Sequence, residues 1–156
     1  MIDPDSPLTL AIRPAKAADI PHLLALENAS FSYDLIDAPT FRYYLTKAHA
    51  KTLLALQGQE PVGYASMFFN SRQKLARLYS IAISAAHRGQ GIAARLYQPL
   101  EVEARRKGCR KVRLEARRDA AHLHKLYANW GFTRTALVKN YYDDGMDAVV
   151  MEKPLT

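Results

Sequence analysis

The middle of the chain reads Ile81-Ala-Ile-Ser-Ala-Ala-His-Arg-Gly-Gln-Gly-Ile-Ala-Ala-Arg-Leu-Tyr97, in which an apolar strand end runs into a glycine-rich turn and then into the start of a helix. In a tight turn after a strand, Gly89 and Gly91 can adopt positive φ angles without a Cβ penalty, so that successive backbone N–H groups converge on one point. The first turn of the helix adds unpaired N–H groups and a favourable dipole, and Arg88 adds a full positive charge. This junction is therefore a candidate binding site for an anion such as a phosphate.

Two familiar phosphate-binding motifs do not fit this turn. A dinucleotide fingerprint needs Gly-x-Gly-x-x-Gly and an acidic residue placed for a ribose, and neither is present. A P-loop needs Gly-Lys-Ser or Gly-Lys-Thr, which is also missing. Loops in every fold use glycine for geometry, so the rest of the chain must decide whether this turn binds a phosphate.

Hydrophobic periodicity predicts a mixed α/β sheet covered by helices, with elements in the order β-α-α-β-β-β-α-β-α-β-β. The predicted strands are 8–13, 52–57, 62–69, 75–84, 111–117, 132–139 and 149–151, and the predicted helices are 17–31, 40–48, 92–107 and 119–131. We expect Asp119 to be the N-cap of the last helix, and Gly108 and Gly131 to end the last two helices. Pro99 predicts a kink or a break in the third helix.

Length and composition bound the possible functions. At 156 residues the chain is expected to form one domain at 8–156, preceded by a flexible tail at 1–7. The net charge of +7 favours anionic partners, which coenzyme A, nucleic acids and membrane surfaces all satisfy. The single cysteine, Cys109, excludes an internal disulfide and a cysteine-rich zinc site. Because the sequence has no apolar run of about 18 residues and no signal peptide, we expect a cytoplasmic protein.

The turn resembles a motif of the GNAT acetyltransferases. Arg88-Gly-Gln-Gly91-Ile-Ala93 is similar to [Arg/Gln]-x-x-Gly-x-[Gly/Ala], which in that family cradles the pyrophosphate of acetyl-coenzyme A. The resemblance covers about Leu8 to Leu155 and implies a mostly antiparallel sheet of six to seven strands with about four helices. It also implies that the cofactor is held at Ile81, Ala82 and Ile83, which would bind the pantetheine arm, and at Arg88, Gly89, Gln90, Gly91, Ile92, Ala93 and Ala94.

The C-terminal half resembles the RimI branch of this family, which acetylates N-terminal amines of proteins. The similar stretches are Leu114-Glu-Ala-Arg117, Leu126-Tyr-Ala-Asn-Trp-Gly-Phe132, Asn140-Tyr-Tyr142 and Gly145-Met-Asp-Ala148. The resemblance implies that Glu115 is the general base and that Tyr127 protonates the departing thiolate. The chemistry suits these residue types, because an amine is mostly protonated at neutral pH and cannot attack a thioester until it loses a proton.

Simpler interpretations compete with both catalytic assignments. Glu115 lies between Arg113 and Arg117 on the polar face of its strand, so alternation alone describes a surface charge that pairs with its neighbours. Tyr127 lies on the apolar stripe of its helix, which is typical of a core residue. His122 and His124 do not have the i, i+4 spacing of a shared metal site, and no metal is expected.

Two positions depart from the family pattern. RimI-like sequences usually carry an Asn that contacts the cofactor where Ala120 stands here, so that side-chain contact is expected to be missing. The position after the glycine turn that usually carries a basic residue is occupied here by Ala94, and Arg95 is displaced by one position around the helix. Neither change removes the backbone groups of the turn, so cofactor binding is expected to survive.

The acceptor is the least constrained part of the prediction. The resemblance implies that it enters between the connector at 31–39 and the hairpin at 141–145. Four tyrosines are candidates for this entrance, namely Tyr33, Tyr79, Tyr141 and Tyr142. Four acids could attract an ammonium group, namely Asp34, Asp37, Asp143 and Asp144. Core tyrosines and exposed loop acids are the competing interpretation.

Three functional hypotheses follow from the sequence. The first is direct acetyl transfer from acetyl-coenzyme A to a protein N-terminal amine, and the second is the same chemistry on a small-molecule amine. The third is a non-catalytic domain that binds acyl-coenzyme A or nucleic acid, suggested by the basic stretch between Arg105 and Arg118. That stretch lacks interleaved aromatic residues, so nucleic acid is not expected as a partner. The sequence leaves a monomer and a homodimer open.

Overall fold

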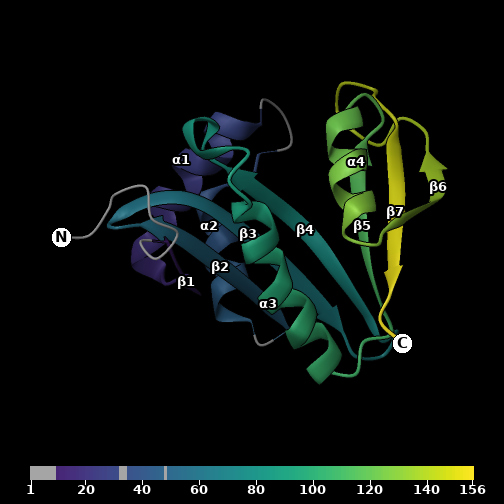
Figure 1. Cartoon of the computed structure of the whole chain (residues 1–156), viewed down its shortest axis with the longest axis horizontal. Coiled ribbons are helices and arrows are strands. Elements are labelled where there is room, and N and C mark those ends of the chain that lie inside the picture. Colours follow the sequence, from purple (N-terminus) through teal and green to yellow (C-terminus); the bar gives the residue numbers. More distant parts are fainter. Residues whose placement is uncertain (1–9, 32–34, 48) are drawn as a thin grey trace. The chain divides into compact units, whose positions relative to one another are not determined.

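The computed structural model describes residues 10–31, 35–47 and 49–156 (Figure 1). The strands are β1 (Leu10–Pro14), β2 (Ala50–Gln57), β3 (Glu60–Asn70), β4 (Leu75–Ile83), β5 (Lys111–Arg117), β6 (Thr133–Val138) and β7 (Ala148–Pro154). The α-helices are α1 (Ile20–Ser30), α2 (Ala38–Thr46), α3 (Ile92–Arg106) and α4 (Ala121–Asn129), and two short 3₁₀ helices are η2 (Ala17–Asp19) and η3 (Ala85–His87). The order of strands and helices predicted from the sequence is confirmed. The predicted tail at 1–7 lies outside the described residues.

The strands form one seven-stranded sheet in the order β1-β2-β3-β4-β5-β7-β6. β1 pairs antiparallel with β2, and β7 pairs antiparallel with both β5 and β6. β4 and β5 are parallel. A parallel pair needs a crossover connection, and α3 provides it. The predicted mostly antiparallel α/β fold is confirmed.

The chain divides into two compact units. The first unit comprises the residues up to Met67 together with Ser80–Leu100, and the second comprises Phe68–Tyr79 together with Glu101–Thr156. Strands β3 and β4 and helix α3 contribute residues to both units. Along the described residues, no helix combines the length and the apolar character needed to span a membrane.

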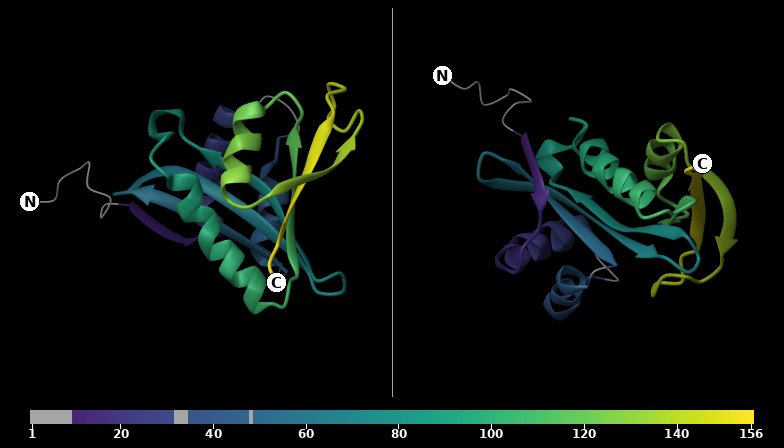
Figure 2. Two further views of the ribbon diagram at one scale, coloured as in Figure 1. Left: turned by 45° about the vertical axis from the view of Figure 1, so that its right-hand side comes forward. Right: turned by 90° about the horizontal axis from the view of Figure 1, so that it is seen from below.

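In the first unit, α1 and α2 cover one face of the sheet and the first half of α3 covers the other (Figure 2). The ring of Phe41 from α2 packs edge-on against that of Tyr64 from β3, with 5.5 Å between ring centroids. On α3, Ile92, Leu96 and Leu100 are buried. Helices α2 and α3 therefore each bury side chains against their own face of the sheet (Figure 2).

In the second unit, β5 alternates as its sequence predicts. Val112, Leu114 and Ala116 are buried, while the charged residues between them are half-buried. Helix α4 lies beside β5 and β7 (Figure 1) and buries Tyr127. The charged face of β5 therefore remains available for polar interactions.

The predicted ends of α3 and α4 are confirmed. Gly108 and Gly131 have φ angles of +80° and +100°, which favour glycine. The N–H groups of Gly108 and Cys109 donate to the carbonyls of Arg105 and Ala104. This is the double hydrogen bond of a Schellman motif, and residues 127–132 repeat it at the end of α4.

Two local expectations are wrong, namely the break that was one alternative at Pro99 and the N-cap at Asp119. α3 continues from Ile92 to Arg106 without a break, because proline removes one hydrogen bond while Leu96 and Leu100 on either side of it stay buried. The N-cap of α4 is Ala120, which has no side-chain cap, and not Asp119. The Asp119 carboxylate accepts hydrogen bonds from Arg117 instead.

Candidate active site

The glycine turn, residues 84–92, joins β4 to α3 in the first unit. Gly89 and Gly91 both have φ angles of +78°, so the positive φ predicted for them is confirmed. Among the described residues, no atom outside the adjoining residues lies within 4 Å of a Cβ built on either glycine, so glycine is required by its backbone angle and not by lack of space. The first intrahelical bond runs from Arg95 N–H to the Gly91 carbonyl, 3.2 Å away. The preceding N–H groups of the first helical turn are thus available to an anion.

The strand before the turn is fixed by a close backbone approach. A Cβ on Gly63 of β3 would lie 2.8 Å from Ile83 Cδ1 and 3.2 Å from the Ala82 carbonyl oxygen. The Ser84 N–H donates to the Val62 carbonyl at 2.8 Å, which ties the start of the turn to β3. Gly63 was missed by sequence reasoning, although a glycine inside a strand pattern is a signal of this kind of close approach.

In the second unit, the ladder between β4 and β5 is short. It pairs Leu75–Arg77 with Lys111–Arg113 and includes three residues of each strand. β5 pairs with β7 along its whole length, and Glu115 lies opposite Val150. Glu115 therefore belongs to the part of β5 that lies beyond the ladder with β4.

Glu115 is held by an arginine from β4. Its Oε2 atom accepts a hydrogen bond from Nε of Arg77 at 2.9 Å, and its side chain is only 16% exposed. The interpretation in which Glu115 pairs with Arg113 and Arg117 is wrong. Side chains two residues apart on one strand are separated by two strand rises, whereas side chains on adjacent strands are closer.

Arg77 joins three of the residues predicted from the sequence. Its Nη2 atom donates to the Tyr141 hydroxyl at 2.9 Å, and its guanidinium lies over the Tyr79 ring, 5.3 Å from the centroid. Tyr79 and Tyr141 are 41% and 42% exposed, so they are not core residues. We call Arg77, Tyr79, Glu115 and Tyr141 the Arg77 cluster. Tyr33, which was also predicted to line the acceptor entrance, lies outside the described residues.

Sequence reasoning missed Arg77. Arg77 and Tyr79 are two positions apart and therefore lie on one face of β4, and this spacing was the one local signal. Its contact with Glu115 depends on the parallel register of β4 and β5, which no local pattern contains.

Tyr127 is buried among aromatic rings of the second unit. Its ring packs edge-on against Trp130 and Phe132, at centroid distances of 5.5 and 6.1 Å. Burial, reinforced by Tyr142, raises the pKa of Tyr127 well above the usual phenol range. Among the described residues no hydrogen bond is found for its hydroxyl. The phenol therefore stays protonated at neutral pH, with no acceptor for its proton among the residues that the structure describes.

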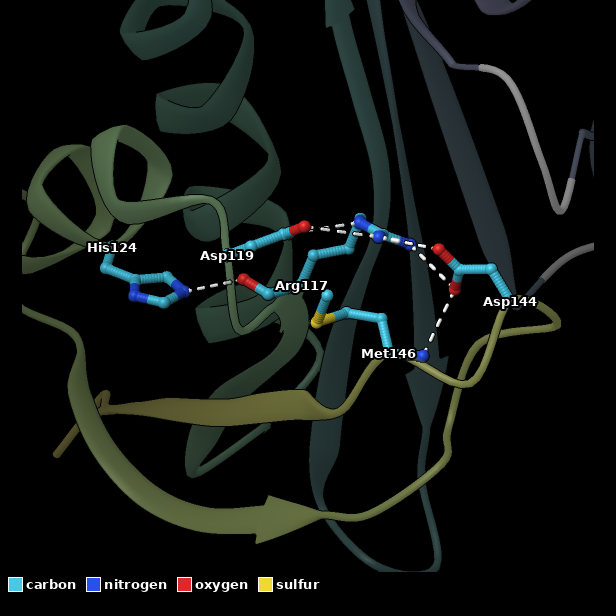
Figure 3. Close-up of polar contacts among 5 residues, drawn as sticks. All are labelled: Arg117, Asp119, His124, Asp144 and Met146. Carbon is cyan, nitrogen blue, oxygen red and sulfur yellow. Dashed lines mark hydrogen bonds and ion pairs between the residues drawn. The ribbon is translucent and has the colours of Figure 1, made fainter.

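The hairpin that carries Tyr141 and Tyr142 is tied to the end of β5 (Figure 3). Arg117 Nη2 donates to Asp144 Oδ2 at 2.8 Å, and Nε donates to Asp119 at 3.2 Å. The Met146 N–H also donates to Asp144, and the Arg117 guanidinium lies over the Tyr142 ring. We call Arg117, Asp119, Tyr142 and Asp144 the Arg117 cluster. These contacts fix the hairpin to the end of β5.

Two of the acids proposed to attract an ammonium have structural partners. The hydrogen bond from Arg117 lowers the pKa of Asp144 and neutralises its charge locally. Asp37 caps α2 by accepting from the Thr40 N–H at 2.9 Å. Asp143 is exposed, and Asp34 lies outside the described residues. The attraction expected of Asp37 and Asp144 is therefore reduced.

A buried carboxylate in the first unit was not predicted. Glu27 is 2% exposed and accepts hydrogen bonds from the Tyr64 hydroxyl and from the Ile36 N–H, the latter at 2.9 Å. It fixes the last part of the connector to α1. Its sequence context, a lone Glu between helical residues, gives no sign of burial.

The side chains of His124 and Cys109 are held within the fold. His124 Nε2 donates to the Arg117 carbonyl at 2.9 Å (Figure 3). Cys109 is buried, and burial raises the pKa of its thiol. Within the described ranges, no group of three or more His, Cys, Asp or Glu side chains is arranged to hold a metal ion.

Comparison with known proteins gives the family. Residues 20–132 match the model of the Acetyltransferase (GNAT) family. A Bacillus subtilis (strain 168) protein, provisionally named a [ribosomal protein bS18]-alanine N-acetyltransferase, is 27% identical over 142 residues, which are 90% of this chain and 93% of that protein.

Two solved structures share the fold. The ribosomal-protein-S18-alanine N-acetyltransferase of Escherichia coli superimposes with a TM-score of 0.83 at 23% identity, over 94% of each chain. A chain of the NatC complex bound to Gag peptide and CoA superimposes with a TM-score of 0.84 at 21% identity, over 94% of this chain and 99% of that one. From the family match, the chain belongs to the GNAT family and is an acetyl-coenzyme A-dependent N-acetyltransferase.

Proposed function

We propose that this enzyme acetylates the N-terminal α-amine of a protein, with Glu115 as general base and Tyr127 as general acid. The observation that carries the proposal is the position of Glu115, a largely buried carboxylate beyond the β4–β5 ladder and bound to exposed acceptor-side residues through Arg77. The similarity to a bS18-alanine N-acetyltransferase supports the choice of a protein amine.

The glycine turn fits the diphosphate of acetyl-coenzyme A. Its two positive-φ glycines leave open space above the backbone, and the N–H groups that begin α3 are not used within the helix. We assign the diphosphate to the backbone of residues 88–94, with Arg88 adding charge, and the pantetheine arm to Ile81, Ala82 and Ile83. An exposed helix N-terminus contributes about 0.3–1 kcal/mol to anion binding, so several N–H groups must share the task.

The bound thioester supplies an activated acetyl group, and the protein moves the protons. Glu115 accepts a proton from the acceptor ammonium, directly or through water, which frees the nitrogen lone pair for attack on the carbonyl carbon. A backbone N–H of residues 81–83 stabilises the developing oxyanion, a contribution of about 2.7–4 kcal/mol for one such donor. As the new C–N bond forms and the C–S bond breaks, Tyr127 donates its proton to the departing sulfur.

An acceptor panel tests this proposal. Purified protein is incubated with acetyl-coenzyme A and with peptides that begin with Ala, Ser or Met, with the same peptides blocked at the N-terminus but carrying a lysine, and with polyamines, aminoglycosides and free amino acids. Mass spectrometry and thiol release report transfer. We expect acetylation of free peptide N-termini and none of the blocked peptides.

Each alternative gives a different result. Acetylation confined to small amines would replace the protein acceptor by a small-molecule one. A thermal shift with acetyl-coenzyme A but no transfer to any amine would indicate a binding domain. Salt-dependent DNA affinity without such a shift would overturn the proposal altogether.

A further inference from the structure

We propose that Arg77 recognises a carboxylate on the acceptor, so that the enzyme prefers amines with an acidic group nearby, above all peptide N-termini with Asp or Glu as first or second residue. This inference rests on the proposed function, because it takes Glu115 as the group that receives the amine proton. It adds the chemical class of the acceptor to that function.

The Arg77 guanidinium has unused donors. An arginine side chain carries five N–H bonds in a planar fork. Nε donates to Glu115 and Nη2 donates to the Tyr141 hydroxyl, both at 2.9 Å, and among the described residues Nη1 forms no hydrogen bond. The side chain is 36% exposed, so this edge of the fork can be reached from solvent.

The neighbouring cations of the second unit have carboxylate partners of their own. Lys111 and Arg113 share Glu152, at 3.0 and 2.9 Å. Arg117 pairs with Asp119 and Asp144. Within the part of the chain that the structure describes, the ion pair of Arg77 is with Glu115 alone.

Catalysis removes the counter-charge of Arg77. When Glu115 accepts the amine proton, its carboxylate becomes neutral and the guanidinium is left without a partner. A partly buried charge without a partner is unfavourable. A carboxylate on the acceptor can bind the fork and restore the pair at that moment. Because this interaction strengthens as the proton moves, it acts on kcat as well as on KM.

Distance limits where the acceptor carboxylate can lie. The amine must come within hydrogen-bond reach of Glu115, and Arg77 is bonded to the same carboxylate. A carboxylate on the first or second residue of a peptide is therefore close enough to bind, and the α-carboxylate of a free amino acid offers the same chemistry. Planar two-point binding of a carboxylate is the geometry that arginine favours over lysine.

Matched acceptors test the inference. We would measure kcat and KM for peptides identical except for Glu, Gln or Lys at residue 2, for a second set that varies residue 1, and for free alanine against its amide. The enzymes would be wild type, Arg77→Gln, Arg77→Lys and the control Arg113→Gln. The control removes the cation that lies opposite Arg77 on β5 and that pairs with Glu152. An acetyl-coenzyme A thermal shift verifies that each variant is folded.

We expect wild type to prefer the Glu peptide over the Gln peptide by about tenfold in kcat/KM, with part of the effect in kcat. Arg77→Gln should abolish the preference, Arg77→Lys should keep part of it, and Arg113→Gln should keep all of it. Equal rates for the Glu and Gln peptides in wild type, or a preference that survives Arg77→Gln, would overturn the inference and leave the proposed function standing. A preference seen only with free alanine would show that the recognised carboxylate is that of an amino acid and not a peptide side chain, and would overturn the peptide acceptor. No transfer to any amine would overturn the proposed function itself.

Discussion

In the proposed function, the glycine turn and the Arg77 cluster bind their ligands in different ways. The turn offers backbone N–H groups, and its demand on sequence is a positive φ of 78° at Gly89 and Gly91. The Arg77 cluster offers side chains, and each contact depends on one particular residue. Side-chain replacement should therefore be tolerated around the turn and damaging in the cluster. The predictions below are designed to break or sharpen this contrast.

Glu115→Gln should have the largest effect. It keeps the shape of the side chain but removes the base, so turnover should fall by about 10²–10⁴-fold while acetyl-coenzyme A affinity stays within about twofold. Steady-state kinetics and calorimetric titration measure the two quantities. The control is Glu152→Gln, a carboxylate of the same unit that pairs with Lys111 and Arg113. Unchanged turnover in Glu115→Gln would remove the residue from the mechanism.

Tyr127→Phe should come next. It removes a hydroxyl for which no hydrogen bond is found within the described residues, so the free energy of unfolding should change by less than about 0.5 kcal/mol. If Tyr127 protonates the thiolate, kcat should nevertheless fall by about 10²-fold. The matched control is Tyr44→Phe, another buried tyrosine of the chain. A normal kcat in Tyr127→Phe would show that Tyr127 is a core residue without a catalytic role.

Asp19→Asn is expected to affect stability and leave turnover intact, because its ion pair joins η2 to β1 and includes no residue of the glycine turn or the Arg77 cluster. The side-chain hydrogen bond from Arg13, at 2.7 Å, lowers the pKa of Asp19 to about 2. A carboxyl group with a lowered pKa stabilises the fold fully at pH values above its unfolded-state pKa near 4. That stabilisation is lost as the pH falls toward 2. At neutral pH the contribution is at most about 2 kcal/mol, because Arg13 is partly exposed. Denaturant unfolding of wild type and variant from neutral to acid pH should show the difference shrinking, and a constant difference would contradict the assignment.

Gly91→Ala should have the smallest effect on turnover among the variants of the two regions, because it acts on cofactor affinity. A non-glycine residue at a φ of +78° costs about 1–2 kcal/mol. If the turn distorts in response, acetyl-coenzyme A affinity should fall about 5- to 30-fold. Gly58→Ala is the matched control, since Gly58 has a φ of +61° and equally open surroundings in the β2–β3 turn. It should lose similar stability and no affinity, and equal affinity losses in both variants would argue against a site at the turn.

The same contrast explains what the sequence could predict. The turn is a local feature, because Gly89, Gly91 and the start of α3 are neighbours in the chain, and its geometry was predicted residue by residue. The Arg77 cluster joins residues 38 and 64 positions apart. Its members Glu115, Tyr79 and Tyr141 were found through resemblance, but Arg77, which connects them, required the register of two parallel strands.

Local rules also failed where a distant charge competed with them. Asp119 has the residue type of an N-cap, yet its carboxylate binds Arg117, and the cap position passes to Ala120. Asp144 was considered as an acid that attracts an ammonium group or as an exposed loop acid, but it is held by the same arginine. In both cases a charge-assisted hydrogen bond to arginine outweighs the neutral or solvated alternative.

The most direct test of the account is an NMR titration that follows the backbone amides of the whole chain as coenzyme A is added, and again with ADP, which carries a diphosphate without the pantetheine arm. The account predicts that both ligands shift the amides of residues 89–94 most strongly, and that coenzyme A alone also shifts those of residues 81–83. Saturating coenzyme A that leaves the amides of residues 89–94 unmoved would contradict it.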